Sequence, residues 1–343
     1  MSSGLLATEQ GVLEVQDAIR GHELDGWLLY EFRGLNPISA ALLGLGKTTR
    51  RGFVLIPDEG EPVALTHSIE ASSWRHWPFG RRTYSSWSEM ETEVAKLVDG
   101  RSRLAMEVSP GAAVPTLDYV PAGMASVLLA LGVSMVSSGD LVSRFHSAWS
   151  ETQLEEHRRA AEIVAATARG AFEKAADAVR TGSPICEGAL SEWIRDELRK
   201  AGLVAGTDCI VAIGPRAADS HYAPVGDGET IKRGDLLLID LWGAFSDSVA
   251  ADQTWMGLLD SRVDERTQEI WEAVRDARDS ALAFMHERYE AGQEVQGFEV
   301  DDIARTLITD RGYGPYFVHR TGHSIDTQPV SYTHLTLPTS DLV

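Results

Sequence analysis

Short strand-like apolar stretches, separated by helix-like ones, fill the first 145 residues of the chain. The stretches that predict strands are 26–30, 51–56, 62–66, 103–107 and 133–136. Residues 57–60, Pro-Asp-Glu-Gly, have a turn composition and predict that the strands on either side form a hairpin. Residues 121–131 predict a helix. This mixture predicts an α/β or α+β domain of ordinary size.

After residue 150 the apolar positions follow the three- to four-residue spacing of amphipathic helices. Ser150 and Gln153 have the spacing of a capping box and predict the start of a long helix. Ser183 and Pro184 predict the start of a second helix, as N-cap and first helical residue. A third helix is expected to turn the following residues inward: Ile270, Trp271, Val274, Ala277, Ala281, Leu282 and Met285. The change of pattern places a domain boundary near residues 147–150.

Residues 234–240 and 250–255 predict two strands, joined by a loop at 243–248. Because side chains alternate between the faces of a strand, an antiparallel pair would bring Asp240 and Asp252 to one face. Asp240 ends an otherwise apolar strand, where a carboxylate must be paired, hydrogen-bonded or bound to a metal. A surface hairpin with solvated acids is the equally open alternative.

Composition narrows the possible partners. The formal net charge is −20, from 51 acidic and 31 basic residues, which disfavours nucleic acids and anionic membranes as partners. The longest apolar run, 124–136, is shorter than the roughly 20 residues of a spanning helix. Two cysteines give no disulfide framework, and the first eleven residues do not resemble a signal peptide. A cytoplasmic protein is expected.

His319 and His323 stand four residues apart, close to the end of the helical region. Arg320 occupies the place where a helical zinc motif has glutamate, and Thr321-Gly322 disfavours a helix. The pair therefore fits a strand or a tight loop that carries both imidazoles on one side. Two hydrogen-bonded structural histidines are the alternative.

The ordered set of these stretches resembles the pita-bread metallopeptidases, which include Xaa-Pro dipeptidase, aminopeptidase P and methionine aminopeptidase. The set consists of His221-Tyr222, Leu238-Ile239-Asp240-Leu241, Ala251-Asp252 and His319-Arg320-Thr321-Gly322-His323. The first half resembles the creatinase-type N-terminal domain of the prolidase branch. The resemblance implies an α+β fold: a creatinase-like α/β domain at 1–147, then an incomplete pita-bread catalytic domain at 150–328, with a curved antiparallel sheet flanked by helices.

The resemblance also implies roles for five residues. Asp240, Asp252 and His323 would be metal ligands, with Asp252 bridging two divalent ions. His221 and His319 would be catalytic and would line the substrate site. Manganese is the first expectation, with cobalt or zinc as alternatives. In such enzymes the ions lower the pKa of a shared water and polarise the scissile carbonyl.

Two departures from the family pattern change these expectations. The gap from Asp240 to Asp252 is one residue longer than usual, and Trp242 is expected to form a bulge. The family's two further glutamate ligands are not found, because no glutamate follows Glu299. Residues 329–343 resemble translated adapter sequence, so a truncated chain with a spurious tail is expected, and on its own an inactive one.

The resulting hypothesis is an intracellular, homodimeric peptidase that hydrolyses the bond to proline in short peptides. A metal-free creatinase-like hydrolase, or a non-catalytic binding module on the same fold, is the alternative.

Overall fold

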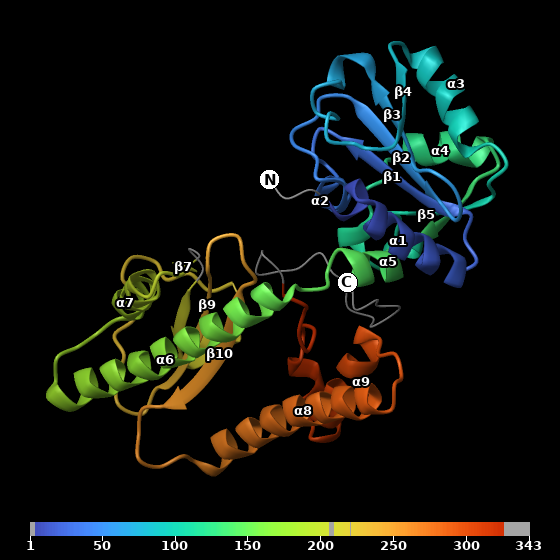
Figure 1. The fold of residues 1–343 in the computed structure, drawn as a ribbon. Coiled ribbons are helices and arrows are strands. Elements are labelled where there is room, and N and C mark those ends of the chain that lie inside the picture. Colours follow the sequence, from blue (N-terminus) through green and yellow to red (C-terminus); the bar gives the residue numbers. More distant parts are fainter. Residues whose placement is uncertain (1–3, 206–208, 220, 326–343) are drawn as a thin grey trace.

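Two β-sheets, each with its own helices, make up the protein, and a long helix leads from one to the other (Figure 1). The structure is a computed structural model that describes residues 4–205, 209–219 and 221–325. Short 3₁₀ helices lie at Leu5–Ala7, Ser68–Glu70, Pro110–Ala112, Pro115–Leu117, Gly214–Ala218 and Gly314–Tyr316. No helix in these described ranges is long and apolar enough to cross a membrane.

The first sheet has six strands in the order β4-β3-β2-β1-β5-β6. The strands are β1 (Gly26–Phe32), β2 (Arg51–Pro57), β3 (Val63–His67), β4 (Gly80–Tyr84), β5 (Arg103–Met106) and β6 (Ser134–Ser137). The β1–β2 and β2–β3 pairs are antiparallel, whereas β4, β5 and β6 join in parallel. The predicted hairpin on either side of residues 57–60 is thus confirmed as β2 and β3.

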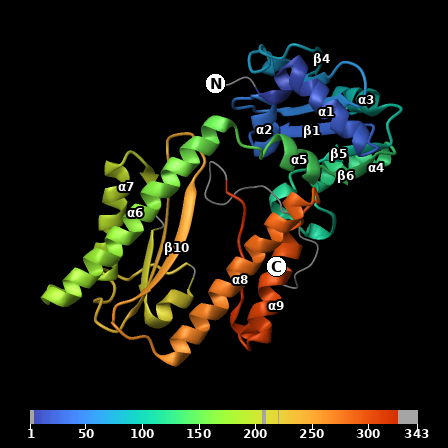
Figure 2. The same ribbon diagram turned by 60° about the horizontal axis from the view of Figure 1, so that its bottom comes forward.

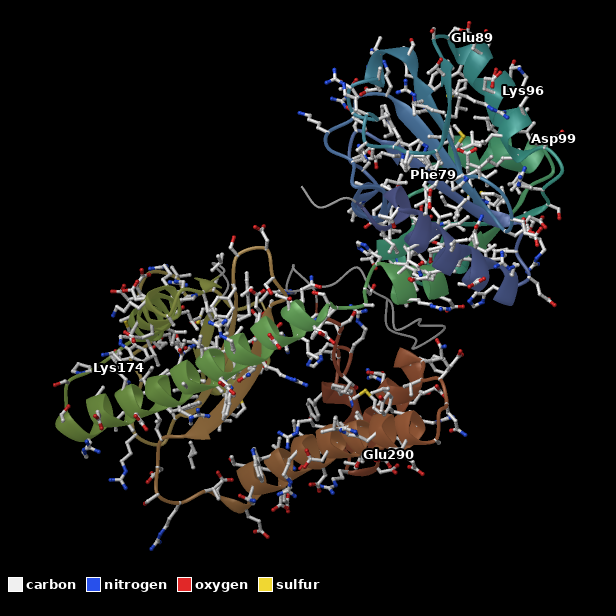
Figure 3. All side chains as sticks on the ribbon, in the orientation of Figure 1. Phe79, Glu89, Lys96, Asp99, Lys174 and Glu290 are labelled. Atoms are coloured by element: carbon white, nitrogen blue, oxygen red, sulfur yellow. The ribbon has the colours of Figure 1, made fainter. Side chains whose placement is uncertain are left out.

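Helices cover both faces of this sheet. They are α1 (Glu9–Gly21), α2 (Pro37–Leu43), α3 (Trp87–Val98), α4 (Ala122–Ala130) and α5 (Gly139–Phe145). Alternate residues of β1 divide between the two cores, with Trp27 and Leu29 packed with α1, α2 and α5. Leu28 and Tyr30 pack with α3 and α4 on the opposite face. Charged side chains such as Glu89 and Lys96 project from the outer side of α3 (Figure 3).

The second sheet is antiparallel and centres on β9 (Leu236–Ala244). One edge of β9 pairs with β10 (Ala251–Leu258), and the other pairs with β7 (Val204–Ala205) and β8 (Ile210–Ile213). Helices α6 (Glu151–Thr181) and α7 (Glu187–Lys200) pack on one face, over a core that includes Leu237, Ile239 and Leu241. The expected capping box of Ser150 and Gln153 begins α6.

The expected start of the second helix at Ser183 and Pro184 is wrong, because α7 begins at Glu187. The backbone N–H of Ile231 donates to the carbonyl oxygen of Ile185, and Cys186 forms a β-bridge with Thr230. This distant pairing keeps the chain extended before Glu187 and overrides the local helix signal.

Helices α8 (Glu265–Glu290) and α9 (Gly297–Asp310) lie side by side, as Figures 1 and 2 show. Their shared core contains Ala277, Ala281, Val300, Ala304 and Ile308. The inward orientation predicted for Ile270, Trp271, Val274 and Leu282 is wrong, since each is at least 40% exposed. Helix α8 carries two apolar stripes, and the narrow one, built from alanines four residues apart, faces α9.

Candidate active site

Two carboxylates lie on the face of the second sheet that is turned away from α6 and α7. In the β9–β10 register Asp240 stands opposite Thr254, and Asp252 stands opposite Trp242. Residues opposite each other point to the same face, so Asp240 and Asp252 are diagonal neighbours on one face. The Thr254 hydroxyl donates a hydrogen bond of 2.9 Å to Oδ1 of Asp240.

The expected bulge at Trp242 is wrong. Pairing runs without interruption from Ala251 opposite Gly243 to Leu258 opposite Leu236. Because the paired residues are regular, the additional residue between Asp240 and Asp252 is accommodated in the loop that connects the two strands. It does not tilt Asp240 out of the sheet.

Partial burial raises the pKa of both carboxyl groups. For Asp240 burial is the main cause, opposed by the hydrogen bond from Thr254 and by the nearby His323. For Asp252 burial is again first, and the charge of Asp240 raises its pKa further, while His323 opposes both effects. A cation at this face would stabilise the charged form of both groups.

His323 approaches the same face from the segment that follows α9. Its Nε2 lies 3.8 Å from Oδ2 of Asp252, and its Nδ1 is 2.9 Å from the carbonyl oxygen of Ser324. Metal–ligand bonds of about 2 Å allow two ligand atoms on one ion to be up to about 4 Å apart. The Asp252–His323 pair is within that range.

The described residues nevertheless do not assemble a complete coordination shell. In the described part of the chain, no group of three or more His, Cys, Asp or Glu side chains is placed to hold a metal ion. The donor chemistry fits a divalent cation, with an oxygen and a nitrogen donor close together and a second carboxylate diagonally beside them.

His221 and His319 lie on exposed loops. The backbone N–H of His221 donates to Oδ1 of Asp219 at 3.0 Å, directly after the 3₁₀ helix at 214–218. The ring of His319 packs edge-on against Phe317 with centroids 5.2 Å apart, and its Nδ1 is 2.7 Å from the carbonyl oxygen of Arg320. These contacts leave the roles of both histidines as predictions.

Sequence reasoning did not identify Glu187, the first residue of α7, which is fully buried. It accepts four hydrogen bonds: from the backbone N–H groups of Ile213 (2.9 Å) and Glu229 (2.8 Å), the Tyr222 hydroxyl (2.7 Å) and Nε of Arg216 (3.3 Å). Glu187 thereby anchors the loop that carries His221. An acidic residue in the first helical turn is so common that its position alone gave no signal.

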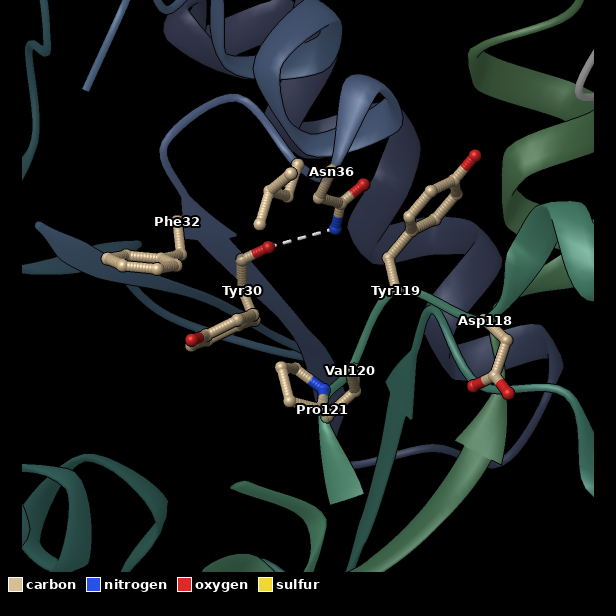
Figure 4. A pocket seen from close by; sticks show the side chains of 8 residues that line it. Tyr30, Phe32, Asn36, Asp118, Tyr119, Val120 and Pro121 are labelled. Carbon is tan, nitrogen blue, oxygen red and sulfur yellow. Dashed lines mark hydrogen bonds between the residues drawn. The ribbon is translucent and has the colours of Figure 1, made fainter. Parts of the chain in front are cut away.

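A separate cavity of about 260 Å³ lies in the first region of the protein (Figure 4). It is lined by Tyr30, Phe32, Leu35, Asn36, Asp118, Tyr119, Val120 and Pro121. The Asn36 amide group is fully engaged in the wall. It donates to the carbonyl oxygen of Tyr30 and to Glu107, and accepts from the backbone N–H of Ser39.

The fold and site define an α+β protein with a helix-covered antiparallel sheet whose open face carries two carboxylates and a nearby imidazole. Residues 155–336 match metallopeptidase family M24. The chain belongs to this family, whose members are metallopeptidases, so divalent metal ions are implied.

Among similar proteins, the Xaa-Pro dipeptidase of Lactobacillus delbrueckii subsp. lactis is 31% identical over 188 residues, which are 54% of this chain and 47% of the dipeptidase. The chain thus spans about half the length of this curated relative. Dipeptidase PepE from Mycobacterium ulcerans superposes with a TM-score of 0.65 at 19% identity, covering 96% of this chain and 84% of PepE.

The prolidase from Pyrococcus horikoshii OT3 superposes with a TM-score of 0.55 at 21% identity, covering 95% of this chain and 84% of the prolidase. The expected fold class, an α+β chain with a pita-bread sheet, is confirmed. The expected tail at 329–343 lies outside the described residues.

Proposed function

We propose that the whole protein is a metal-dependent peptidase of the Xaa-Pro dipeptidase and aminopeptidase type. It hydrolyses the bond to proline in short peptides. The observation that carries the proposal is the β9–β10 register, which places Asp240 and Asp252 on one half-open face with His323 beside Asp252. Membership of family M24 supports the same chemistry.

Asp240, Asp252 and His323 are assigned to metal binding, with two divalent ions, manganese first and cobalt or zinc as alternatives. When bound, such ions polarise a carbonyl and lower the pKa of a water molecule. His221 and His319 are assigned to the substrate site, where an imidazole can hold a proton or pass it on.

The proposal also includes a homodimer, short peptides as the partners, a cytoplasmic location, and domains at 1–147 and 150–328.

The test combines metal titration with hydrolysis of an Xaa-Pro dipeptide by the purified whole protein. Asp252→Ala is expected to weaken manganese binding and to abolish hydrolysis, because it removes the carboxylate nearest to His323. His319→Ala is expected to slow turnover while manganese remains bound. Asp302→Ala, an exposed position on α9, is the matched control and should change neither property.

Full hydrolysis by Asp252→Ala after exhaustive chelation would instead support a metal-free hydrolase that works through its histidines. Absence of hydrolysis in the unaltered protein, with manganese bound, would support a binding module.

A further inference from the structure

The segment that carries His319 and His323 has no regular secondary structure. Residues 317–325 form neither helix nor strand, and they follow the 3₁₀ helix at Gly314–Tyr316. In Figures 1 and 2 this red segment lies between β10 and α8. Because it has no ladder of backbone hydrogen bonds, its conformation must be fixed by side chains of neighbouring elements.

Asp301 on α9 makes one set of side-chain hydrogen bonds to this segment. It is only 4% exposed, and its Oδ1 accepts hydrogen bonds from both the backbone N–H (2.7 Å) and the hydroxyl (2.8 Å) of Thr321. Thr321 stands midway between His319 and His323 in the chain. One buried oxygen therefore fixes the backbone and the side chain of the residue that separates the two histidines.

Arg305, one helical turn later on α9, makes the other set. Its Nε donates to Oδ2 of Asp301 at 2.8 Å. Its two terminal nitrogens donate to the carbonyl oxygens of Phe317 and His319, each at 2.9 Å. The guanidinium group also stacks on the Phe317 ring, 4.4 Å from its centroid. The rigid fork of arginine can make all of these contacts together, and lysine cannot.

The histidine rings depend on this backbone for their orientation. His319 and His323 each place Nδ1 against a carbonyl oxygen of the next residue, Arg320 and Ser324 respectively. Such a local contact orients a ring relative to its own backbone. The position of the ring in the site therefore depends on the conformation of that backbone.

We propose that Asp301 and Arg305 form a positioning pair, which fixes the backbone of residues 317–321 and so presents His319 and His323 to the carboxylate face of β9 and β10. This inference rests on the proposed function for its catalytic consequence. The structural part, in which the pair orders the segment, is independent of it. Neither residue touches the carboxylates, so both act through the histidines.

The test compares Arg305→Lys with Arg311→Lys. Arg305 lies in α9 and Arg311 is the C-cap residue of the same helix, and each forms an ion pair with an aspartate. The partner of Arg311 is Asp276 on α8, so its ion pair does not involve residues 317–321. Replacement of an arginine that pairs with an aspartate is thus common to both variants, whereas loss of the arginine fork on the histidine segment occurs only in Arg305→Lys.

Hydrogen–deuterium exchange is the first readout. In Arg305→Lys, exchange of the Phe317 and Thr321 amides, which donate hydrogen bonds to Gly314 and Asp301, is expected to rise about tenfold or more, with exchange in α6 and β9 unchanged. Arg311→Lys should leave exchange in residues 317–321 as in the unaltered protein. Equal exchange in the two variants would overturn the proposal. Asp301→Asn tests the other member of the pair. Thr321→Val removes only the hydroxyl donor to Asp301, so it should give a smaller increase in exchange, and it replaces Asp301→Asn if that variant does not fold.

Metal affinity and kinetics are the second readout. Disturbing groups that support metal ligands commonly costs 10- to 100-fold in affinity or activity. For Arg305→Lys, manganese binding is expected to weaken by about tenfold and kcat to fall similarly, with KM within about twofold. If the unaltered protein neither binds manganese nor hydrolyses dipeptides, the proposed function fails, and the exchange result still decides whether the pair orders the segment.

Discussion

The two sheets of this protein bury their strands in different ways. Residues 27–30 of β1, in the first sheet, are buried and apolar on both faces, with Trp27 and Leu29 in one core and Leu28 and Tyr30 in the other. In β9 of the second sheet only alternate residues enter a core, and the opposite face carries Asp240. Water is excluded from both faces of residues 27–30, whereas β9 is covered on one side only and keeps a partly open face on which a carboxylate can meet solvent or a cation.

A related contrast separates two buried glutamates, Glu107 in the first region and Glu187 in the second. Glu107 in the first region is fully buried and accepts hydrogen bonds from the side chains of Trp27, Asn36 and Ser138, all of them neutral. Burial is the main influence and raises its pKa. Glu187 in the second region is as deeply buried, but backbone N–H groups, a tyrosine and an arginine donate to it. Burial again acts to raise its pKa, and these donors together outweigh burial, so the pKa is lowered.

The largest expected effect is on the open face of β9. Asp240→Asn should lower hydrolysis by the whole protein at least about a hundredfold, because a carboxamide is a poor ligand for a divalent cation. Thermal stability should stay the same or rise slightly, because the change removes a half-buried charge that repels Asp252. Steady-state kinetics and thermal unfolding measure the two effects.

Asp247→Asn, in the exposed loop between β9 and β10, is the control for that change, since asparagine tolerates the positive φ of 60° at this position. A strong loss of stability in Asp240→Asn without loss of hydrolysis would make Asp240 a structural residue.

A matched pair of truncations on β9 tests the difference between its faces. Ile239→Ala, in the core under α6, should lower the free energy of unfolding by about 2–5 kcal/mol. Leu238→Ala, one residue earlier and only half-buried, should cost about 1 kcal/mol, because part of that side chain is already in contact with water. Urea unfolding measures both, and equal costs would mean that the second face is covered as fully as the first.

The sequence predicted the face on which a strand residue lies, because side chains alternate along a strand with a period of two. Alternation along residues 234–240 and 250–255 was enough to place Asp240 and Asp252 on one face, and the structure has them there. On α8 the pattern failed, because Ala277 and Ala281 face α9 while the larger Trp271 faces outward. Apolar spacing identifies a stripe, but it does not determine which of two stripes meets the neighbouring helix.

Glu187 and Asp301 were missed for a different reason. Each stands in the first two turns of a helix, where acidic residues are common and usually solvated. Their partners are distant in the chain: Glu187 binds groups at Ile213 and Glu229, and Asp301 binds Thr321. Only the tertiary fold brings these donors to the carboxylates, so the residue types alone could not mark either position as buried.

The smallest expected effect is the opposite pH dependence of the contributions that Glu107 and Glu187 make to stability. A raised pKa, as for Glu107, means that its contribution to stability is fully present below the ordinary value of 4.5 and is lost as the pH rises through the folded-state pKa. A lowered pKa, as for Glu187, means that its contribution is present above 4.5 and is lost as the pH falls through the folded-state pKa. Glutamine does not titrate, so each substitution removes the pH dependence that the glutamate contributes. The unfolding free energy of Glu107→Gln relative to the unaltered protein should therefore rise as the pH increases from 4 to 7, and that of Glu187→Gln should fall. Urea unfolding at several pH values measures both slopes, and slopes of the same sign would show that the donors around Glu187 do not outweigh its burial.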